Sequence, residues 1–90
     1  MNWQIEFIKK AKKEFLCLDK QTRSRIIKFL EDNLVKHNNP RSLGKALHGN
    51  LAGLWRYRVG DCRIICQIQD HHLLILVVAI GHRKDVYKIN

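Results

Sequence analysis

The run of eight apolar residues from Leu73 to Ile80 constrains the fold more than any other segment of the sequence. It is much shorter than the about 20 residues that cross a bilayer. A strand that is apolar at every position is typical of the centre of a sheet, where both faces are covered. Because 90 residues allow only one small core, we predict a single domain, residues 1–90, built around this strand.

Amphipathic patterns before this run predict a short strand and two helices. Apolar residues alternate with polar ones over residues 3–7, which is typical of a half-buried strand. Two stripes of apolar residues at helical spacing follow. The first consists of Phe7, Ala11, Phe15 and Leu18, and the second of Ile26, Ile27, Leu30 and Leu34. Asp19 is a suitable N-cap for the second helix, and Pro40 disfavours the helical conformation of the residue before it. The short connection predicts an antiparallel helical hairpin.

Two alternating runs, residues 54–59 and 62–69, flank the dipeptide Gly60–Asp61. A dipeptide of this type between two strands is typical of a two-residue hairpin loop. A second turn at residues 70–72 leads into the apolar strand. We therefore predict an α+β fold in which the N-terminal strand and the helical hairpin pack on a small, mostly antiparallel twisted sheet. A single layer of helices covers one face, so another segment must cover part of the other face.

The two-residue loop fixes which side chains share a face of the sheet. It pairs Arg58 with Arg63, and residues two apart or directly opposite lie on the same face. Arg56, Arg58 and Arg63 therefore converge, whereas Trp55 and Tyr57 point to the other side and are expected to pack. Like charges directly across a strand pair cost a few tenths to about 1 kcal/mol. Because the planar guanidinium binds phosphate in bidentate fashion, we expect an anion to complete this site.

The charge of the whole chain agrees with an anionic partner. The net charge is +9, and residues 33–60 contain no acidic residue but do contain Lys36, Arg41 and Lys45 as well as two of the arginines above. A positive field of this kind attracts polyanions, of which nucleic acid is the commonest. The lysines of residues 9–13 lie between Glu6 and Glu14 and indicate a solvated helix face instead.

The C-terminal segment 81–87 adds His82, Arg83, Lys84 and Tyr87 near the arginine face. Whether Arg83 points to that face depends on whether the turn at residues 70–72 has two residues or three, and the sequence leaves both open. Guanidinium, imidazole and phenol groups suit cleavage of RNA by its own 2′-hydroxyl, because arginines can stabilise the doubly charged phosphorane without a metal. A non-catalytic anion-binding surface, a packing tyrosine and a surface histidine are the alternatives.

The cysteines and glycines indicate no other chemistry. Three cysteines cannot all pair within the chain, and we expect reduced thiols in a cytoplasm. Cys62 and Cys66 would lie about 13 Å apart along one strand, too far to share a zinc ion, and Cys17 is expected in the core. The glycines form no phosphate-binding loop, so we predict no metal and no cofactor.

The sequence resembles the RelE branch of the RelE/ParE toxin superfamily. The resemblance rests on Leu47–Gly49, on the run Gly53–Ile64 (GLWRYRVGDCRI) and on the closing Gly81–Tyr87 (GHRKDVY), and it extends over the whole chain. It implies a bacterial toxin of a type II toxin–antitoxin pair. Such a toxin enters the A site of the 30S ribosomal subunit, cuts the mRNA there without a small-molecule cofactor and inhibits translation. It implies a cytoplasmic protein with an acidic antitoxin as its partner and no membrane association.

The resemblance also implies roles for individual residues. Lys45, Arg56, Arg58 and Lys84 would bind the RNA, with Arg56 and Arg58 also in the catalytic set. Arg63 and Arg83 match arginines that stabilise the transition state or donate a proton. Tyr87 matches a tyrosine near the scissile nucleotide, as base or stacking partner, and His82 matches a basic or histidine position.

Two features leave other functions open. Cys62 stands where the family usually has tyrosine, but the predicted register turns it away from the arginines, so we expect a loss of packing and not of chemistry. The ParE branch shares the fold, poisons DNA gyrase and lacks the arginine-rich site. A ParE-like gyrase inhibitor without enzymatic activity is therefore one alternative. The other is an inactive relative that acts only in antitoxin binding and co-repression.

Overall fold

A computed structural model describes residues 3–82 and 84–87 of the chain. The strands are β1 (Gln4–Phe7), β2 (Lys45–Ala46), β3 (Leu54–Val59), β4 (Cys62–Gln69) and β5 (Leu74–Gly81). The helices are α1 (Lys9–Leu16) and α2 (Lys20–Lys28), and α2 continues into a π-helical turn, Phe29–Leu34. Short 3-10 turns comprise η2 (Pro40–Leu43), η3 (Gly49–Leu51), η4 (Asp70–His72) and η5 (Lys84–Tyr87). None of the described helices is long and apolar enough to cross a membrane.

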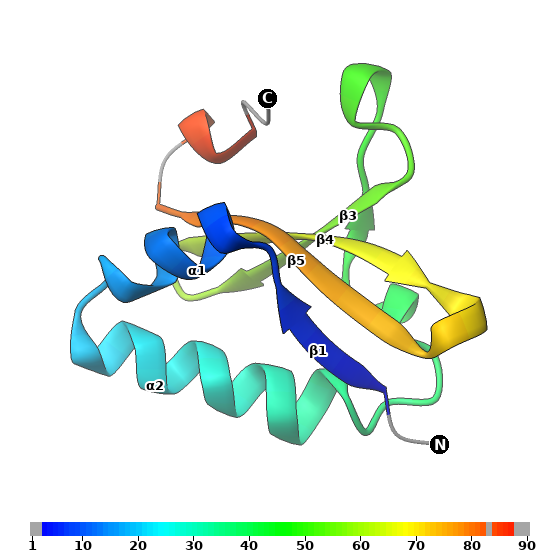
Figure 1. The fold of residues 1–90 in the computed structure, drawn as a ribbon, viewed down its shortest axis with the longest axis horizontal. Coiled ribbons are helices and arrows are strands. Elements are labelled where there is room, and N and C mark those ends of the chain that lie inside the picture. The colour runs from blue at the N-terminus through cyan, green and yellow to red at the C-terminus, as the bar shows by residue number, and fades with distance from the viewer. Residues whose placement is uncertain (1–2, 83, 88–90) are drawn as a thin grey trace.

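The five strands form one open sheet in the order β1-β5-β4-β3-β2. β1 pairs with β5 in parallel, and the other pairs are antiparallel. The fold is therefore α+β with a mostly antiparallel sheet, as predicted, and β5 occupies an interior position (Figure 1). The apolar strand begins one residue later than its pattern suggests, because Leu73 adopts a left-handed backbone conformation with φ of 48° in the turn.

The helical hairpin covers one face of the sheet and encloses the main core. Asp19 caps α2, since its carboxylate accepts a hydrogen bond from the backbone N–H of Thr22 at 3.1 Å. The expected core position of Cys17 is wrong, because its side chain is exposed. It follows the last residue of α1, Leu16, and lies outside the apolar stripe of that helix. The most deeply buried side chains of this core include Ala11, Ile26, Leu30, Leu34, Tyr57, Ile64, Ile75 and Val77.

A second, smaller apolar cluster lies on the opposite face of the sheet. Its buried members are Ile65, Ala79 and Val86, and Leu47, Leu54, Val78 and Tyr87 pack against them. A β-bulge in the pairing of β4 with β5 skips Val78, so Val78 and Ala79 both join this cluster. The C-terminal turn η5 (red in Figure 1) thus covers part of the face that the helices leave open.

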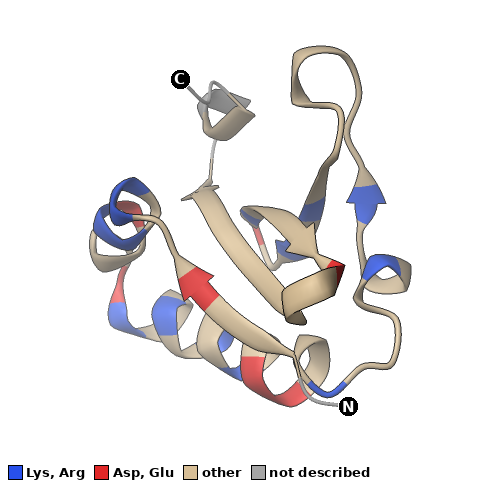
Figure 2. Ribbon diagram, turned by 45° about the vertical axis from the view of Figure 1, so that its right-hand side comes forward, with Lys and Arg blue, Asp and Glu red and all other residues tan. Residues whose placement is uncertain are grey.

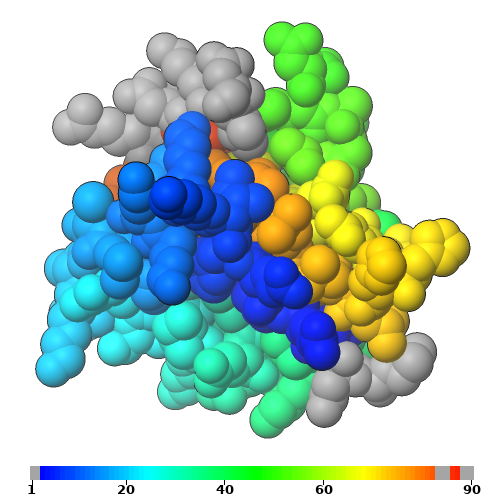
Figure 3. Space-filling view, in the orientation of Figure 1, coloured from blue at the N-terminus to red at the C-terminus, as the bar shows by residue number. Residues whose placement is uncertain are grey.

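The segment from Pro40 to Ala46 is fastened to β3 by close contacts. The hydroxyl of buried Tyr57 donates to the Pro40 carbonyl at 2.8 Å. A Cβ atom on Gly44 would lie 2.8 Å from both the carbonyl oxygen of Arg56 and ring atom Cε1 of Tyr57, so only glycine allows this approach. β2 lies in a stretch for which the sequence pattern predicts no strand. The connection from β2 to β3 (green) projects from the molecule in Figure 3.

We predict that Gly44→Ala lowers the free energy of unfolding by about 1–3 kcal/mol, because the added methyl group forces the η2–β2 segment away from β3. Urea denaturation monitored by circular dichroism measures this change. Gly81→Ala is the matched control, since its Cβ would meet Val86 at an ordinary contact distance of 3.6 Å. Equal stability of the Gly44→Ala variant and the control would contradict the close approach.

The ion pair between Arg41 and Asp70 gives the fold a pH-dependent contribution. Hydrogen bonds from Arg41, at 2.9 and 2.7 Å, hold the pKa of the Asp70 carboxyl below its usual range. This contribution is present above the unfolded pKa of about 3.9 and is lost as the pH falls through the lowered native pKa. We expect the urea midpoint of Asp70→Asn to lie below that of the wild type near neutral pH. The difference should close as the pH falls through this lowered native pKa, and a difference independent of pH would refute the linkage.

Candidate functional site

Three arginines of the β3–β4 hairpin form the centre of the candidate site. The register pairs Val59 with Cys62, Arg58 with Arg63, and Arg56 with Ile65, which confirms the predicted two-residue loop. Arg56, Arg58 and Arg63 therefore share the face of the sheet that lies away from the helices. Arg58 is exposed, whereas Arg56 and Arg63 are half-buried.

Tyr87 lies between two of these arginines. An Nη of Arg56 donates to the phenol oxygen of Tyr87 at 3.3 Å. The guanidinium carbon of Arg63 lies 5.6 Å from the centre of the Tyr87 ring, within the range of a cation–π interaction. Because Val86 is buried beside Ile65 and Ala79, the turn η5 is anchored and holds the phenol in this position. The structure thus brings together Arg56, Arg63 and Tyr87 from three parts of the chain.

The remaining residues of the predicted site occupy different places. Lys45 on β2 pairs with Arg56 and is exposed beside it. His82 is exposed and lines a depression of about 380 Å³ together with Glu14, Cys17 and Leu18 from the α1 side of the molecule. No hydrogen bond between His82 and the arginines or Tyr87 is present among the described residues. Arg83 lies outside the described residues, and Lys84 begins η5.

The arginine cluster has no counter-charge among the side chains that the structure describes. Among the described side chains, the one ion pair joins Arg41 and Asp70, at 2.7 Å, and neither residue belongs to the cluster. The Nε atoms of Arg56 and Arg63 are buried and make no hydrogen bond within this part of the chain. Basic positions line the strands at the β2 edge of the sheet as well as both helices (Figure 2). The cluster is therefore suited to an anion from outside the chain.

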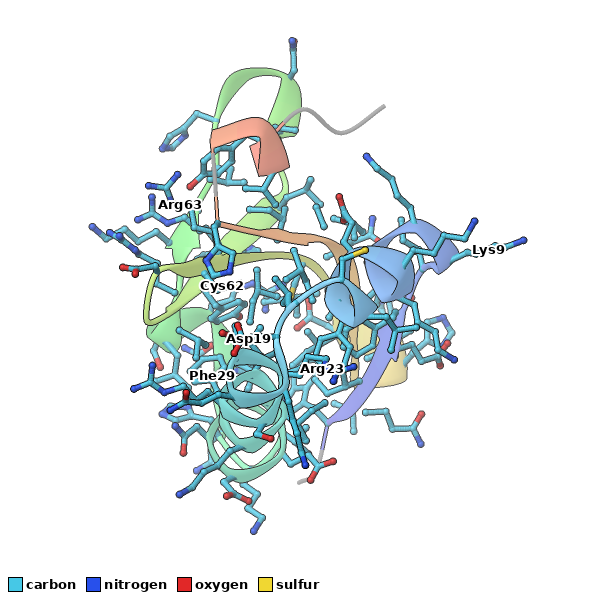
Figure 4. The ribbon with its side chains drawn as sticks, turned by 90° about the vertical axis from the view of Figure 1, so that its left-hand side faces the viewer. Lys9, Asp19, Arg23, Phe29, Cys62 and Arg63 are labelled. Atoms are coloured by element: carbon cyan, nitrogen blue, oxygen red, sulfur yellow. The ribbon has the colours of Figure 1, made fainter. Side chains whose placement is uncertain are left out.

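The faces of β4 separate the arginine site from the core. In Figure 4, Cys62 lies toward the helical layer, where Asp19 and Phe29 are found, and Arg63 lies on the other side. Cys62 is fully buried, and burial raises the pKa of its thiol. Tyr57 is buried in the same core and Trp55 packs against it, which confirms the predicted packing of these two residues. The departure from tyrosine at position 62 thus affects the core and not the arginine face.

A depression next to the arginines includes residues that the sequence did not indicate. Ser42, Leu43, Gly44 and Lys45 from the η2–β2 segment line it together with Arg56 and Arg58, and its volume is about 320 Å³. Ser42 and Leu43 were missed because nothing in their local pattern places them against β3. The available signal was the acid-free stretch around Lys45, which indicates a basic surface without showing its shape.

Fold and site together define a small α+β protein with a cationic, partly open sheet face. Residues 5–87 match the family described as "ParE toxin of type II toxin-antitoxin system, parDE". Toxin RelG of Mycobacterium tuberculosis is 26% identical over 88 residues, which cover 98% of this chain and 99% of RelG. Toxin RelE of the same organism is 40% identical over 53 residues, which cover 59% of this chain and 55% of that protein.

The fold of this chain also occurs in a known toxin–antitoxin complex. The crystal structure of the RelBE2 complex of Mycobacterium tuberculosis contains a chain that matches with a TM-score of 0.84 and 24% sequence identity, covering 92% of this chain and 100% of that one. The chain belongs to the RelE/ParE family and is a toxin of the type II toxin–antitoxin class. The resemblance seen in the sequence is thereby confirmed.

We predict that the arginine face binds single-stranded RNA through about four phosphates. The logarithm of the affinity should then fall with the logarithm of the salt concentration with a slope near −3. Arg58→Ala should reduce the steepness by about 0.7, the loss of one phosphate contact. Fluorescence anisotropy of a labelled oligonucleotide measures both slopes.

Lys9→Ala is the matched control for this measurement, because it removes the same charge from α1. Lys9 points away from the molecule on the side opposite Arg63 (Figure 4). The salt dependence of RNA affinity should have the same slope in Lys9→Ala as in the wild type. A slope near zero for the wild type, or equal reductions in both variants, would show that the arginine face does not capture RNA specifically.

Proposed function

We propose that this toxin is a ribosome-dependent endoribonuclease that cuts mRNA in the A site and so inhibits translation. The observation that carries the proposal is the convergence of Arg56, Arg63 and Tyr87 on one face, with Arg58 beside them. No carboxylate forms an ion pair with these arginines among the described side chains. This is the arrangement that charge stabilisation at a phosphate requires.

The reaction would use the 2′-hydroxyl of the RNA as its nucleophile. Removal of its proton allows the 2′-oxygen to attack the adjacent phosphorus, and the bond to the 5′-oxygen breaks as that oxygen receives a proton. Arg56, Arg58 and Arg63 would offset the two negative charges of the phosphorane between these steps. Tyr87 would act as base or as stacking partner of the scissile nucleotide, because Arg56 and Arg63 hold its phenol beside the same position.

The other residues implied by the resemblance complete this proposal. Lys45, Arg56, Arg58 and Lys84 would bind the RNA. Arg83 would stabilise the transition state or donate a proton, and His82 is a further candidate for proton transfer. The ribosome would hold the mRNA codon in place, which a small domain with a shallow site needs, since orientation accounts for a large part of catalysis.

An acidic antitoxin is the second partner in the proposal. The related chain in the RelBE2 structure belongs to a toxin–antitoxin complex, and the net charge of +9 favours rapid, salt-sensitive binding of an acidic protein. The matched family description, ParE toxin, also supports a gyrase-directed inhibitor as the second candidate function. Such a protein would act by binding alone and would not depend on the arginine cluster.

Expression of the chain without an antitoxin, followed by mapping of mRNA 5′ ends, separates these functions. We expect growth arrest with new 5′ ends at codon boundaries of translated mRNA. Arg63→Ala and Arg83→Ala should each reduce cleavage by about 100-fold or more, because each removes a group that stabilises the developing charge. Lys9→Ala, which removes a distant positive charge, should leave cleavage unchanged.

Three results would exclude the nuclease. Full toxicity of the Arg63→Ala, Arg83→Ala double variant would show that the arginines are not needed. Accumulated DNA breaks with intact mRNA would identify the gyrase inhibitor instead. Harmless expression of the wild-type chain would favour an inactive relative. Circular dichroism spectra of the variants would confirm that they fold.

A further inference from the structure

The depression beside Arg56 has the size and charge of a site for one nucleotide. Its volume of about 320 Å³ lies at the lower end of the range of small-molecule sites. The charged residues that line it are Lys45, Arg56 and Arg58, all of them cations. A phosphate bound between these side chains would gain charge-assisted hydrogen bonds.

The position of this depression is next to the arginine–tyrosine cluster and not at its centre. Arg56 belongs to both places, since one of its terminal nitrogens bonds to Tyr87 while its side chain also lines the depression. Lys45 lies on β2, two strands from Arg63 on β4, and is offset from it by two residues along the strands, which together correspond to roughly 12 Å. An RNA strand with its scissile phosphate near Arg63 and Tyr87 would therefore place a neighbouring nucleotide here.

The remaining wall of the depression offers contacts for a base. Leu43 is 39% exposed, and the only other exposed large apolar side chain in the described part of the chain is Leu16 on α1. An exposed apolar side chain at the rim of a cationic depression suits the face of a nucleobase, which is apolar, next to a charged backbone.

Ser42 adds a directional polar contact to this wall. Its hydroxyl donates to the Asn39 carbonyl at 2.8 Å, so its single proton is already used. While that hydrogen bond is kept, the Ser42 oxygen is free to accept a hydrogen bond from a ligand. The exocyclic amines of cytosine and adenine can donate such a bond, whereas the corresponding group of uracil is a carbonyl acceptor.

We infer that this depression is a specificity subsite, which binds the nucleotide next to the scissile phosphate and prefers an amino-bearing base to uracil. Lys45 and Arg58 hold its phosphate, Leu43 contacts the face of its base, and Ser42 accepts from its exocyclic amine. The inference rests on the proposed nuclease function for its biological role. The nucleotide preference itself can be measured without cleavage.

Titration of the full, isotopically labelled chain with 5′-CMP and 5′-UMP, followed by NMR, tests the subsite directly. The backbone amides of Gly44 and Lys45 should shift, and CMP should bind about two- to tenfold more tightly than UMP, the effect of one hydrogen bond. Ser42→Ala should abolish this ratio, and the matched control Ser24→Ala on α2 should retain it. Equal affinities for the two nucleotides, or shifts confined to the α1 lysines, would overturn the inference.

Cleavage of ribosome-bound mRNAs whose codons differ only in cytosine or uracil tests the role in the reaction. We expect Ser42→Ala to bring the ratio of the two cleavage rates close to one. Leu43→Ala should lower both rates, because Leu43 contacts the face of either base, and the control Leu16→Ala, which trims the other exposed leucine, should leave both rates unchanged. If the wild-type chain cuts neither mRNA, the proposed nuclease fails while the NMR titration still decides the subsite. If it cuts both and the ratio is unchanged in Ser42→Ala, the subsite is refuted and the nuclease stands.

Discussion

The register of the β3–β4 hairpin is the constraint on which the rest of the structure depends. Gly60 adopts a φ of +60° in the two-residue turn, a left-handed conformation that glycine accepts without steric cost. A slip of one residue would turn every side chain of a strand to the other face. Such a slip would bury the arginines under the helices and expose Tyr57 and Ile64. Burial of the apolar side chains therefore keeps three like charges together on the outer face.

The outer face remains only partly covered, and this determines where the site can be. The cluster of Ile65, Ala79 and Val86 closes the apolar part of that face, while Arg56 and Arg58 extend toward the β2 edge, where only the short η2–β2 segment follows. Because Val86 is buried, the adjacent Tyr87 is fixed at the boundary between the apolar cluster and the arginines. The turn η5, which follows the last strand, thus contributes a side chain to a site formed mainly by the sheet.

Local chemistry explains which parts could be predicted from the sequence. The hairpin register and the arginine face follow from the Gly60–Asp61 dipeptide and strict alternation, and Asp19 is recognisable as a cap from its own side chain. β2 and the depression beside it could not be predicted, because they depend on the contact of Gly44 with Tyr57, two residues separated by a loop. The direction of the segment after β5 depends on the bulge at Val78, which no local pattern indicates. This is why counting residues in the preceding turn could not place Arg83.

The arginine cluster links stability to binding. Arg58 and Arg63 face each other across the strand pair, which costs up to about 1 kcal/mol without a ligand, and the buried core offsets this cost. Any polyanion that binds only the folded chain relieves the repulsion and stabilises the fold by mass action. RNA and an acidic protein would both do so and would compete for the same guanidinium groups. An acidic partner that covers these arginines would therefore protect the toxin from unfolding and block its site through the same contacts, because stabilisation and inhibition have one electrostatic origin.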